Sequence, residues 1–381
     1  MKALLLAAAL LAPAAMAQAP ADVPAVVSQY ASVVHATYED ALDGARHLTE
    51  KVAAFAAQPS APRLDEARKA WLAAREVYGQ SEAFRFYGGP IDDEHGPEGR
   101  LNGWPMDESY VDAVKGKARS GLVNNRKVPI TRKTLAAQNE RGGEENIATA
   151  WHAIEFLLWG QDLDESGPGR RSVEDFVDGK APNADRRRQY LVVVTDLLVD
   201  DLASLVQAWA PKGANYRARF ERGGTESLRK IFVGLGSLSR GELAGERLEV
   251  ALASQDQEDE HSCFSDNTHR DVVANATGIE NVWLGRYRRA DGTLLQGPSP
   301  RDLVAAKDAA LAERVTKQIA ASVAAANALQ PPFDREIVGG DDAPGRKRVR
   351  ALIDSLVQQS KDLVSAANAV GITRLTLVQP R

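Results

Sequence analysis

The chain has 381 residues, and its 47 Lys and Arg against 52 Asp and Glu give a formal net charge of −5 at pH 7. This balance argues against a nucleic-acid partner, because proteins that bind nucleic acids carry a basic surface. The single cysteine, Cys263, cannot form an intrachain disulfide, so the stability of the protein has to come from packed cores.

The N-terminus predicts a secretory signal peptide, residues 1–17. Lys2 precedes an apolar stretch at 3–12, and the small residues Ala15 and Ala17 frame a cleavage site. No cysteine follows this site, and no later apolar stretch reaches about 18 residues, so neither a lipid anchor nor a transmembrane segment is predicted. We therefore expect a periplasmic or secreted protein.

The rest of the chain carries apolar residues at helical spacing. Helices are predicted at 23–57, 64–87, 144–160, 186–209, 225–240, 243–256, 266–288, 300–329 and 345–370. This pattern predicts an all-α fold of two helical-bundle halves packed together. The best candidate for a boundary between the halves is the stretch 210–216. We therefore divide the chain into an N-terminal bundle, 18–212, and a C-terminal bundle, 213–381.

Two stretches rich in Gly, Pro and Asp, at 88–110 and 160–183, predict long ordered loops. Loops of this length within a compact domain are often functional.

The segment AWHAIEFLLWGQD, residues 150–162, places potential metal ligands in an apolar helix. His152, Glu155 and Asp162 share one face, because residues at steps of three and four lie together on a helix. A buried imidazole and a buried carboxylate need partners. Mixed ligation by His and carboxylate suits iron or zinc.

The predicted helix at 64–87 offers a second polar face, formed by Arg75, Tyr78, Glu82 and Arg85. If this face meets the first, Glu82 supplies another carboxylate ligand. The arginines and Tyr78 would support it, since guanidinium groups orient carboxylates through paired hydrogen bonds.

Structural interpretations compete with these functional ones. A His-x-x-Glu pair is often an ordinary side-chain hydrogen bond, and the Arg and Glu face is equally typical of a structural ion-pair network. Zinc peptidases carry His-Glu-x-x-His or His-x-x-Glu-His. Phe156 follows Glu155 here, so the second histidine is missing and no general base can be assigned.

Two other segments hold candidate residues. In QDQEDEHSCFSDNTHRD, residues 255–271, Glu258 and His261 share a helix face, although a solvated helix end is an equal interpretation. In GLGSLSRGELAGERL, residues 234–248, the small residues favour a tight helix junction. The same segment could bring Ser237, Arg240 and Glu242 toward the site.

Several of these segments together resemble the imelysin family, in particular its iron-regulated protein A branch. The matching stretches are SEAFRFYGGPID, LNGWPMDESY, AWHAIEFLLWGQD, GSLSRGELAGER and EDEHSCFSDNTH. The resemblance implies an all-helical fold of two facing bundles, a link to bacterial iron acquisition and, in some classifications, a metallopeptidase. The family motif Gly-x-His-x-x-Glu falls on His152 and Glu155, with Ala150 in place of the glycine. Because alanine is small and favours helices, we expect the geometry to survive.

We therefore predict an exported protein that binds a divalent or ferric metal ion, iron or zinc, through His152, Glu155, Glu82 and Asp162. Its role would be iron acquisition, by binding the metal or a metal-bearing ligand, with other iron-uptake proteins of the envelope as partners. The alternatives are a metal-dependent peptidase and an envelope interaction module without a metal.

Overall fold

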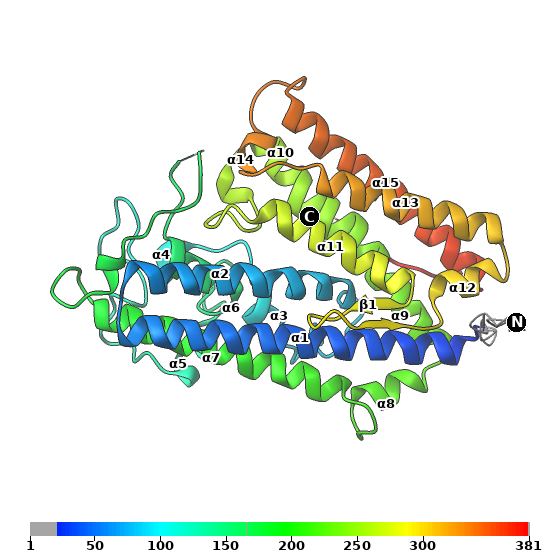
Figure 1. Ribbon diagram of the computed structural model, residues 1–381, viewed down its shortest axis with the longest axis horizontal. Coiled ribbons are helices and arrows are strands. Elements are labelled where there is room, and N and C mark those ends of the chain that lie inside the picture. The colour runs from blue at the N-terminus through cyan, green and yellow to red at the C-terminus, as the bar shows by residue number, and fades with distance from the viewer. Residues whose placement is uncertain (1–20, 165, 380–381) are drawn as a thin grey trace, which may run out of the picture.

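The computed structural model describes residues 21–164 and 166–379, and helices dominate this part of the chain (Figure 1). The predicted all-α class is confirmed. The predicted signal peptide lies outside the described residues. Among the described helices, none is both long enough and apolar enough to cross a membrane.

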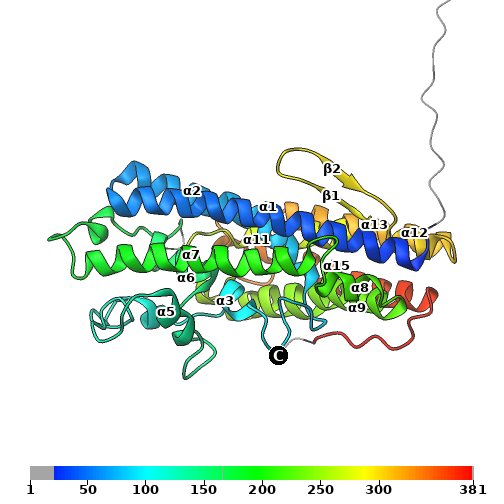
Figure 2. The same cartoon turned by 90° about the horizontal axis from the view of Figure 1, so that it is seen from below.

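One group of helices surrounds α1 (Val23–Ala57), the longest helix described. It packs along α2 (Ala61–Tyr78) and α7 (Ala184–Trp209), and α6 (Ala150–Trp159) closes the group against α2 and α7. Figure 2 shows α1 and α7 running side by side. Shorter elements in the connections are η1 (Gly79–Phe84), α3 (Glu98–Asn102), α4 (Glu108–Val111), α5 (Arg132–Gln138) and η2 (Val173–Phe176).

A second group lies on the other side of α2. Its long helices are α9 (Thr225–Ser237), α11 (Thr268–Trp283), α13 (Ala309–Asn327) and α15 (Pro344–Ala369). Figure 1 shows α11 between α2 and the pair formed by α13 and α15. The remaining elements are α8 (Tyr216–Glu221), the π-helical η3 (Leu238–Glu249), α10 (Val250–Ser254), η4 (Gln257–Asp259), α12 (Pro300–Ala305), α14 (Asp334–Ile337) and the antiparallel strands β1 (Arg286–Arg288) and β2 (Leu294–Gln296).

The two groups meet where α11 packs on the end of α2 and on η1. Gly79 makes this approach close, because a Cβ at this position would lie 2.7 Å from Cβ of Ala274 on α11. The α-helix ends at Tyr78, and the chain continues as the tighter 3₁₀ helix η1. The prediction of one continuous helix at 64–87 was therefore wrong at its C-terminal end.

Other predicted boundaries also shift. The helix predicted at 144–160 begins only at Ala150, and the one predicted at 300–329 divides into α12 and α13. That division has a local cause, since Ser299 caps the first helix with a capping box and Asp308 caps the second. The helix predicted at 266–288 ends at Trp283, and the hairpin β1–β2 follows it.

Candidate metal centre

The helix α6 buries its whole length, including the two polar residues of the His-x-x-Glu motif. Nδ1 of His152 lies 2.8 Å from Oε2 of Glu155. The second carboxylate oxygen, Oε1, accepts hydrogen bonds from the backbone N–H of Ser265 at 2.9 Å and from its hydroxyl at 2.6 Å. Both oxygens of Glu155 are thus engaged, while Nε2 of His152 is buried without a hydrogen-bond partner among the described residues.

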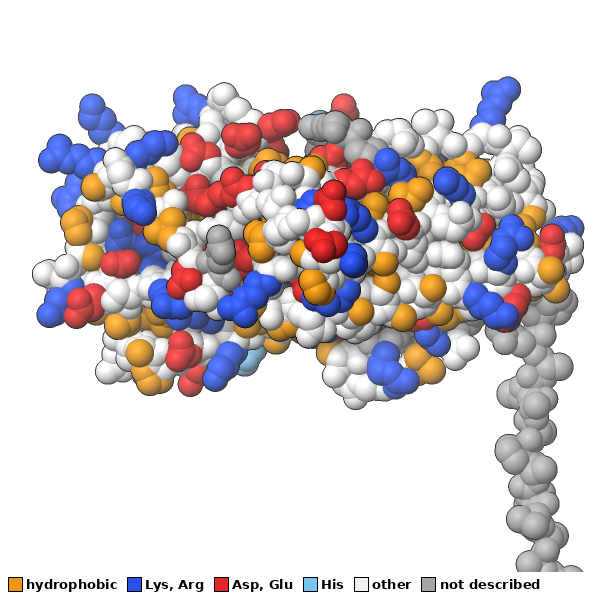
Figure 3. Space-filling model, turned by 90° about the horizontal axis from the view of Figure 1, so that it is seen from above, with side chains coloured by type: hydrophobic (Ala, Val, Ile, Leu, Met, Phe, Trp, Pro, Cys, Tyr) orange, Lys and Arg blue, Asp and Glu red, His pale blue; other side chains and the backbone are white. Residues whose placement is uncertain are grey.

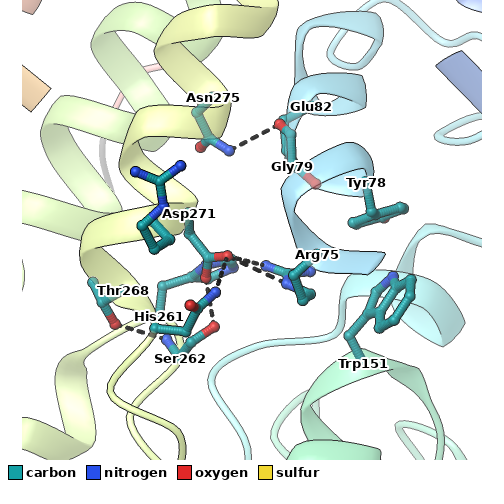
Figure 4. Close-up of polar contacts among 12 residues, drawn as sticks. Arg75, Tyr78, Gly79, Glu82, Trp151, His261, Ser262, Thr268, Asp271 and Asn275 are labelled. Carbon is teal, nitrogen blue, oxygen red and sulfur yellow. Dashed lines mark hydrogen bonds and ion pairs between the residues drawn. The ribbon is translucent and has the colours of Figure 1, made fainter. Parts of the chain in front are cut away.

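A second histidine and carboxylate pair lies beside the first. Nδ1 of His261 is 2.8 Å from Oδ2 of Asp271, which also accepts a hydrogen bond from the Ser262 hydroxyl. Figure 4 shows Asp271 between these residues and Arg75, whose Nη2 lies 3.0 Å from Oδ1. Burial opposes ionisation of Asp271, but Arg75 and the hydrogen bonds hold its pKa well below the usual range. The ionised carboxylate therefore accepts the Nδ1 proton of His261.

The two imidazole rings are neighbours, with centroids 4.7 Å apart and planes inclined by 72°. Nε2 of His261, like that of His152, is buried without a hydrogen-bond partner among the described residues. Burial lowers the pKa of each ring to about 3, assisted by Arg75 at His152 and by Arg247 at His261. Both imidazoles are therefore neutral at neutral pH, which is the form that binds metals.

The two carboxylates differ in charge because only one has a cationic partner. Asp271 contacts Arg75 directly, whereas Glu155 receives hydrogen bonds from the neutral residue Ser265. Burial raises the pKa of Glu155 to about 8, and the hydrogen bonds from Ser265 lower it only in part. Glu155 and His152 therefore form a neutral hydrogen-bonded pair at pH 7.

Glu82 on η1 lies in a neighbouring ion-pair network. Its Oε2 accepts hydrogen bonds from Nη1 of Arg85 at 2.5 Å and from Nη2 of Arg247 at 2.9 Å. Burial raises its pKa, but Arg85 and then Arg247 outweigh this effect and lower the pKa to about 2. Oε1 is buried without a hydrogen-bond partner among the described residues. Arg247 also contacts Glu242 and Asn275, so two positive charges are shared among several acceptors.

A cavity of about 360 Å³ leads to His261. Arg85, Arg247 and Trp104 line it together with the carboxylates of Glu98, Glu140, Glu144, Glu242 and Glu246. On the face seen in Figure 3, acidic side chains gather left of the centre. The five carboxylates that line the cavity raise the local concentration of cations.

The structure separates several of the residues that we predicted to act together. Asp162 lies with Asp266 and Asp334, where potential ligand oxygens of the three are within 4.8 Å of one another. No other group of three or more His, Cys, Asp or Glu side chains in the described residues meets this distance, so His152, Glu155, Glu82 and Asp162 are not gathered as one such set.

The supporting residues are also divided. Arg75, Arg85, Glu242 and His261 belong to the networks around the histidines, and the ring of Tyr78 packs against that of Trp151. Three others lie elsewhere. The Ser237 hydroxyl accepts from the backbone N–H of Val378, Arg240 pairs with Glu249, and Glu258 lines a different cavity.

The family model described as Imelysin, a peptidase M75 family, matches residues 34–363. The chain belongs to the imelysin family. This confirms the resemblance seen in the five sequence segments.

The individual proteins to which the chain is similar are distant in sequence. The chain is 28% identical over 346 residues to the iron-regulated protein A of Synechococcus elongatus, covering 87% of this chain and 84% of that protein. A crystal structure described as a putative iron-regulated protein A precursor of Parabacteroides distasonis superposes with a TM-score of 0.71 at 17% identity, covering 93% of this chain and 98% of that one. An imelysin-like protein of Psychrobacter arcticum gives a TM-score of 0.64 at 14% identity, covering 92% and 97%.

The backbone at the start of α6 is unusual at the position where the imelysin motif has its glycine. Ala150 stands at the glycine position and has a φ of +75°, in the left-handed region that favours glycine. It is the first residue of the helix rather than an interior one. Our expectation that helix propensity makes alanine favourable here was therefore based on the wrong position in the helix.

Sequence reasoning missed several residues of this imelysin centre, among them Asp271, Ser265 and Arg247. The first two lie in the segment 255–271, which stands out by its His, Cys and acidic content. Arg247 and Asn275 gave no comparable signal, because a single Arg or Asn on an amphipathic helix is common. Their role becomes visible only through Glu82, which lies 165 residues before Arg247.

Proposed function

We propose that this imelysin-family protein binds a transition-metal ion, iron or zinc, through Nε2 of His152 and Nε2 of His261. The observation that carries the proposal is the pairing of two adjacent neutral imidazoles, each with its Nδ1 against a carboxylate and its Nε2 buried without a partner among the described residues. Metal-ligating histidines usually donate their other N–H to a carboxylate or carbonyl, which fixes ring and tautomer.

Glu155 and Asp271 then act as positioning residues, and Glu82 is a nearby anionic residue. The negative charge of Glu82 interacts with both imidazoles, and its free oxygen Oε1 is available. Because Glu82, His152 and His261 are not gathered within 4.8 Å, the remaining coordination positions suit water or a metal-bearing ligand that enters through the cavity next to His261.

The biological role that we propose is iron acquisition outside the cytoplasm. Two observations support it: the similarity to a protein named iron-regulated protein A, and an N-terminus that predicts a signal peptide. The partners would be other iron-uptake proteins of the envelope. The acid-lined cavity supports a cationic cargo.

The test is the metal content of untagged protein, followed by calorimetric titration of metal-free protein with Fe²⁺ and Zn²⁺. We expect near-stoichiometric binding in the wild type and its loss in His152→Ala and in His261→Ala. The matched control is His47→Ala, since His47 is exposed on α1. Unchanged binding in both test variants would overturn the proposal.

The same variants test the peptidase alternative that the family name carries. His261 borders a cavity, so a metal held there could present a water molecule to a peptide. Hydrolysis of unfolded casein that stops with chelator and in His152→Ala would favour this alternative. Metal binding without hydrolysis would favour a binding protein.

A further inference from the structure

A second cluster of carboxylates lies apart from the histidine pair. It joins three distant parts of the chain: Asp162 after α6, Asp266 before α11, and Asp334 at the start of α14. The three side chains are at most 7% exposed, and potential ligand oxygens of all three lie within 4.8 Å of one another. We call these three residues the aspartate cluster.

A fourth buried acid, Glu260, lies near this cluster. Only 1% of it is exposed, and neither of its carboxylate oxygens has a hydrogen-bond partner among the described residues. Its charge interacts with Asp334, Asp266 and Asp162, so it lies near them, outside the set whose ligand oxygens are within 4.8 Å of one another. A buried carboxylate without a hydrogen bond is costly, so this side chain points to a ligand that supplies the missing interaction.

Several buried acids elsewhere in the described part of the chain have guanidinium partners. Arg187 pairs with Asp112, Arg75 with Asp271, and Arg348 with Glu336. By contrast, no ion pair between described residues involves Asp162, Asp266 or Glu260. Burial, and then the neighbouring charges of Asp334 and Asp162, raise the pKa of Asp266 to about 8. A bound cation would supply the positive partner that Asp162, Asp266 and Glu260 lack among the described residues.

We propose that the aspartate cluster binds a hard divalent cation, Ca²⁺, at a site separate from the histidine pair, with Glu260 as a nearby buried acid. Ca²⁺ takes six to eight oxygen ligands at about 2.3–2.6 Å, so two ligands on opposite sides of one ion are separated by about 4.8 Å. The ligand oxygens of the three aspartates lie within 4.8 Å of one another, so one ion of this size can contact all three. The cluster offers no nitrogen or sulfur ligand, which distinguishes its preference from that of the two imidazoles.

The cation reaches the cluster from solvent through its own cavity. Asp334 lines a cavity of about 420 Å³, together with the acidic residues Asp256 and Glu258. This cavity differs from the one that leads to His261, which has Arg85, Trp104 and Arg247 in its wall. Each site therefore has its own opening to solvent.

The experiment is a calorimetric titration of chelator-treated full-length protein with CaCl₂, and in parallel with MgCl₂. We expect one Ca²⁺ per chain, weaker binding of Mg²⁺, and a Kd raised at least tenfold in Asp266→Asn and in Asp334→Asn. His152→Ala should bind Ca²⁺ like the wild type, because His152 lies outside the cluster. Asp201→Asn is the matched control, since Asp201 forms an ion pair with Arg100 and takes no part in the cluster.

The asparagine variants keep the side-chain shape and remove charge, so they are expected to fold. Circular dichroism and thermal unfolding without added metal check this, and Ca²⁺ should raise the Tm of the wild type but not of the variants. No Ca²⁺ binding by folded wild type, or equal binding by the two cluster variants, would overturn the proposal. Binding of Fe³⁺ or Zn²⁺ in place of Ca²⁺ at this cluster would do so as well.

Discussion

Replacing Glu155 with glutamine tests whether this carboxylate sets the tautomer of His152. In the wild type, Oε2 faces Nδ1 of His152 and Oε1 accepts two hydrogen bonds from Ser265. A metal at Nε2 requires a proton on Nδ1, and this proton needs an acceptor. Glutamine has a single acceptor oxygen, so it cannot serve both His152 and Ser265.

The new side chain in Glu155→Gln has two possible arrangements, and both weaken metal binding. If the amide oxygen faces Ser265, the NH₂ group faces Nδ1 of His152 and keeps the imidazole proton on Nε2, where it blocks the metal. Ionised Glu155 can instead accept this proton from Nδ1. If the oxygen faces His152, the buried N–H and O–H of Ser265 lose their acceptor. An unsatisfied buried donor costs about 1–3 kcal/mol, which corresponds to a Kd raised about 5- to 150-fold.

The assay is titration of metal-free Glu155→Gln with Zn²⁺, with ¹⁵N NMR of the histidine side chains to identify the tautomer. Glu76→Gln is the control, because Glu76 forms a half-exposed ion pair with Arg270. Metal affinity within twofold of the wild type, with Nδ1 still protonated, would refute the reasoning.

The pH dependence of binding gives a second readout for the same pair. Burial raises the pKa of Glu155 to about 8. Below this pH, Glu155 and His152 together carry one proton that has to leave when a metal binds Nε2 of His152. Zinc affinity in the wild type should therefore rise with pH up to about 8 and then level off. Glu155→Gln should lack this proton-linked slope, because the amide does not titrate.

Three further predictions concern stability. Ala150→Gly removes the backbone strain of a φ of +75°, which costs alanine about 1–2 kcal/mol. The variant also loses a buried methyl group, and glycine makes the unfolded chain more flexible. These effects oppose each other, so the unfolding free energy should change by less than about 1 kcal/mol. The buried helical control Ala153→Gly has no such relief and should lose about 1–2 kcal/mol in urea unfolding; equal losses would contradict the strain at Ala150. Asp112→Asn leaves Arg187 and Arg171 without their buried partner and should cost about 3–5 kcal/mol at pH 7. Burial opposes ionisation of Asp112, but these arginines lower its pKa, so its contribution is present above pH of about 4 and should shrink as the pH falls below it; a pH-independent difference would be inconsistent. Gly79→Ala should cost about 1–3 kcal/mol through the contact with Ala274, and Gly79→Ala combined with Ala274→Gly should recover most of the loss.

The long helices were predictable because their apolar pattern persists over many turns. The helix predicted at 23–57 agrees with α1, and the one at 186–209 differs from α7 by two residues at its start. In contrast, the change from α2 to η1 at Gly79 depends on the close approach of α11, which lies almost 200 residues away in sequence. Local periodicity contains no information about such a contact.

The histidine centre was predictable only in part, for a similar reason. The motif on α6 identified His152 and Glu155, because polar residues in an apolar helix require partners. His261 appeared only as a supporting residue, and Asp271 was not singled out. The segment that leads from His261 to Asp271 shows neither helical nor strand periodicity in the sequence. The directions of these two side chains therefore follow from tertiary hydrogen bonds, such as those of Ser262 to Asp271 and Thr268.

The same irregular segment connects the two proposed metal sites. Asp266 belongs to the aspartate cluster and Glu260 lies near it. His261 and Ser265, which directly adjoin these two acids in sequence, contact His152 and Glu155 respectively. A cation in the cluster would hold this segment in place and so preorganise His261. Binding at the two sites should then be coupled.

Coupling of this kind is reciprocal, which makes it a sharp prediction. Saturating Ca²⁺ should lower the Kd for Zn²⁺ by a factor of about 5–150, and Zn²⁺ should lower the Kd for Ca²⁺ by the same factor. Calorimetric titrations in both orders measure the two factors, and Asp334→Asn, which alters the cluster from α14 without touching the segment's own sequence, should abolish both. Equal Zn²⁺ affinities with and without Ca²⁺, in protein shown to bind both ions, would mean that the segment keeps His261 in place unaided.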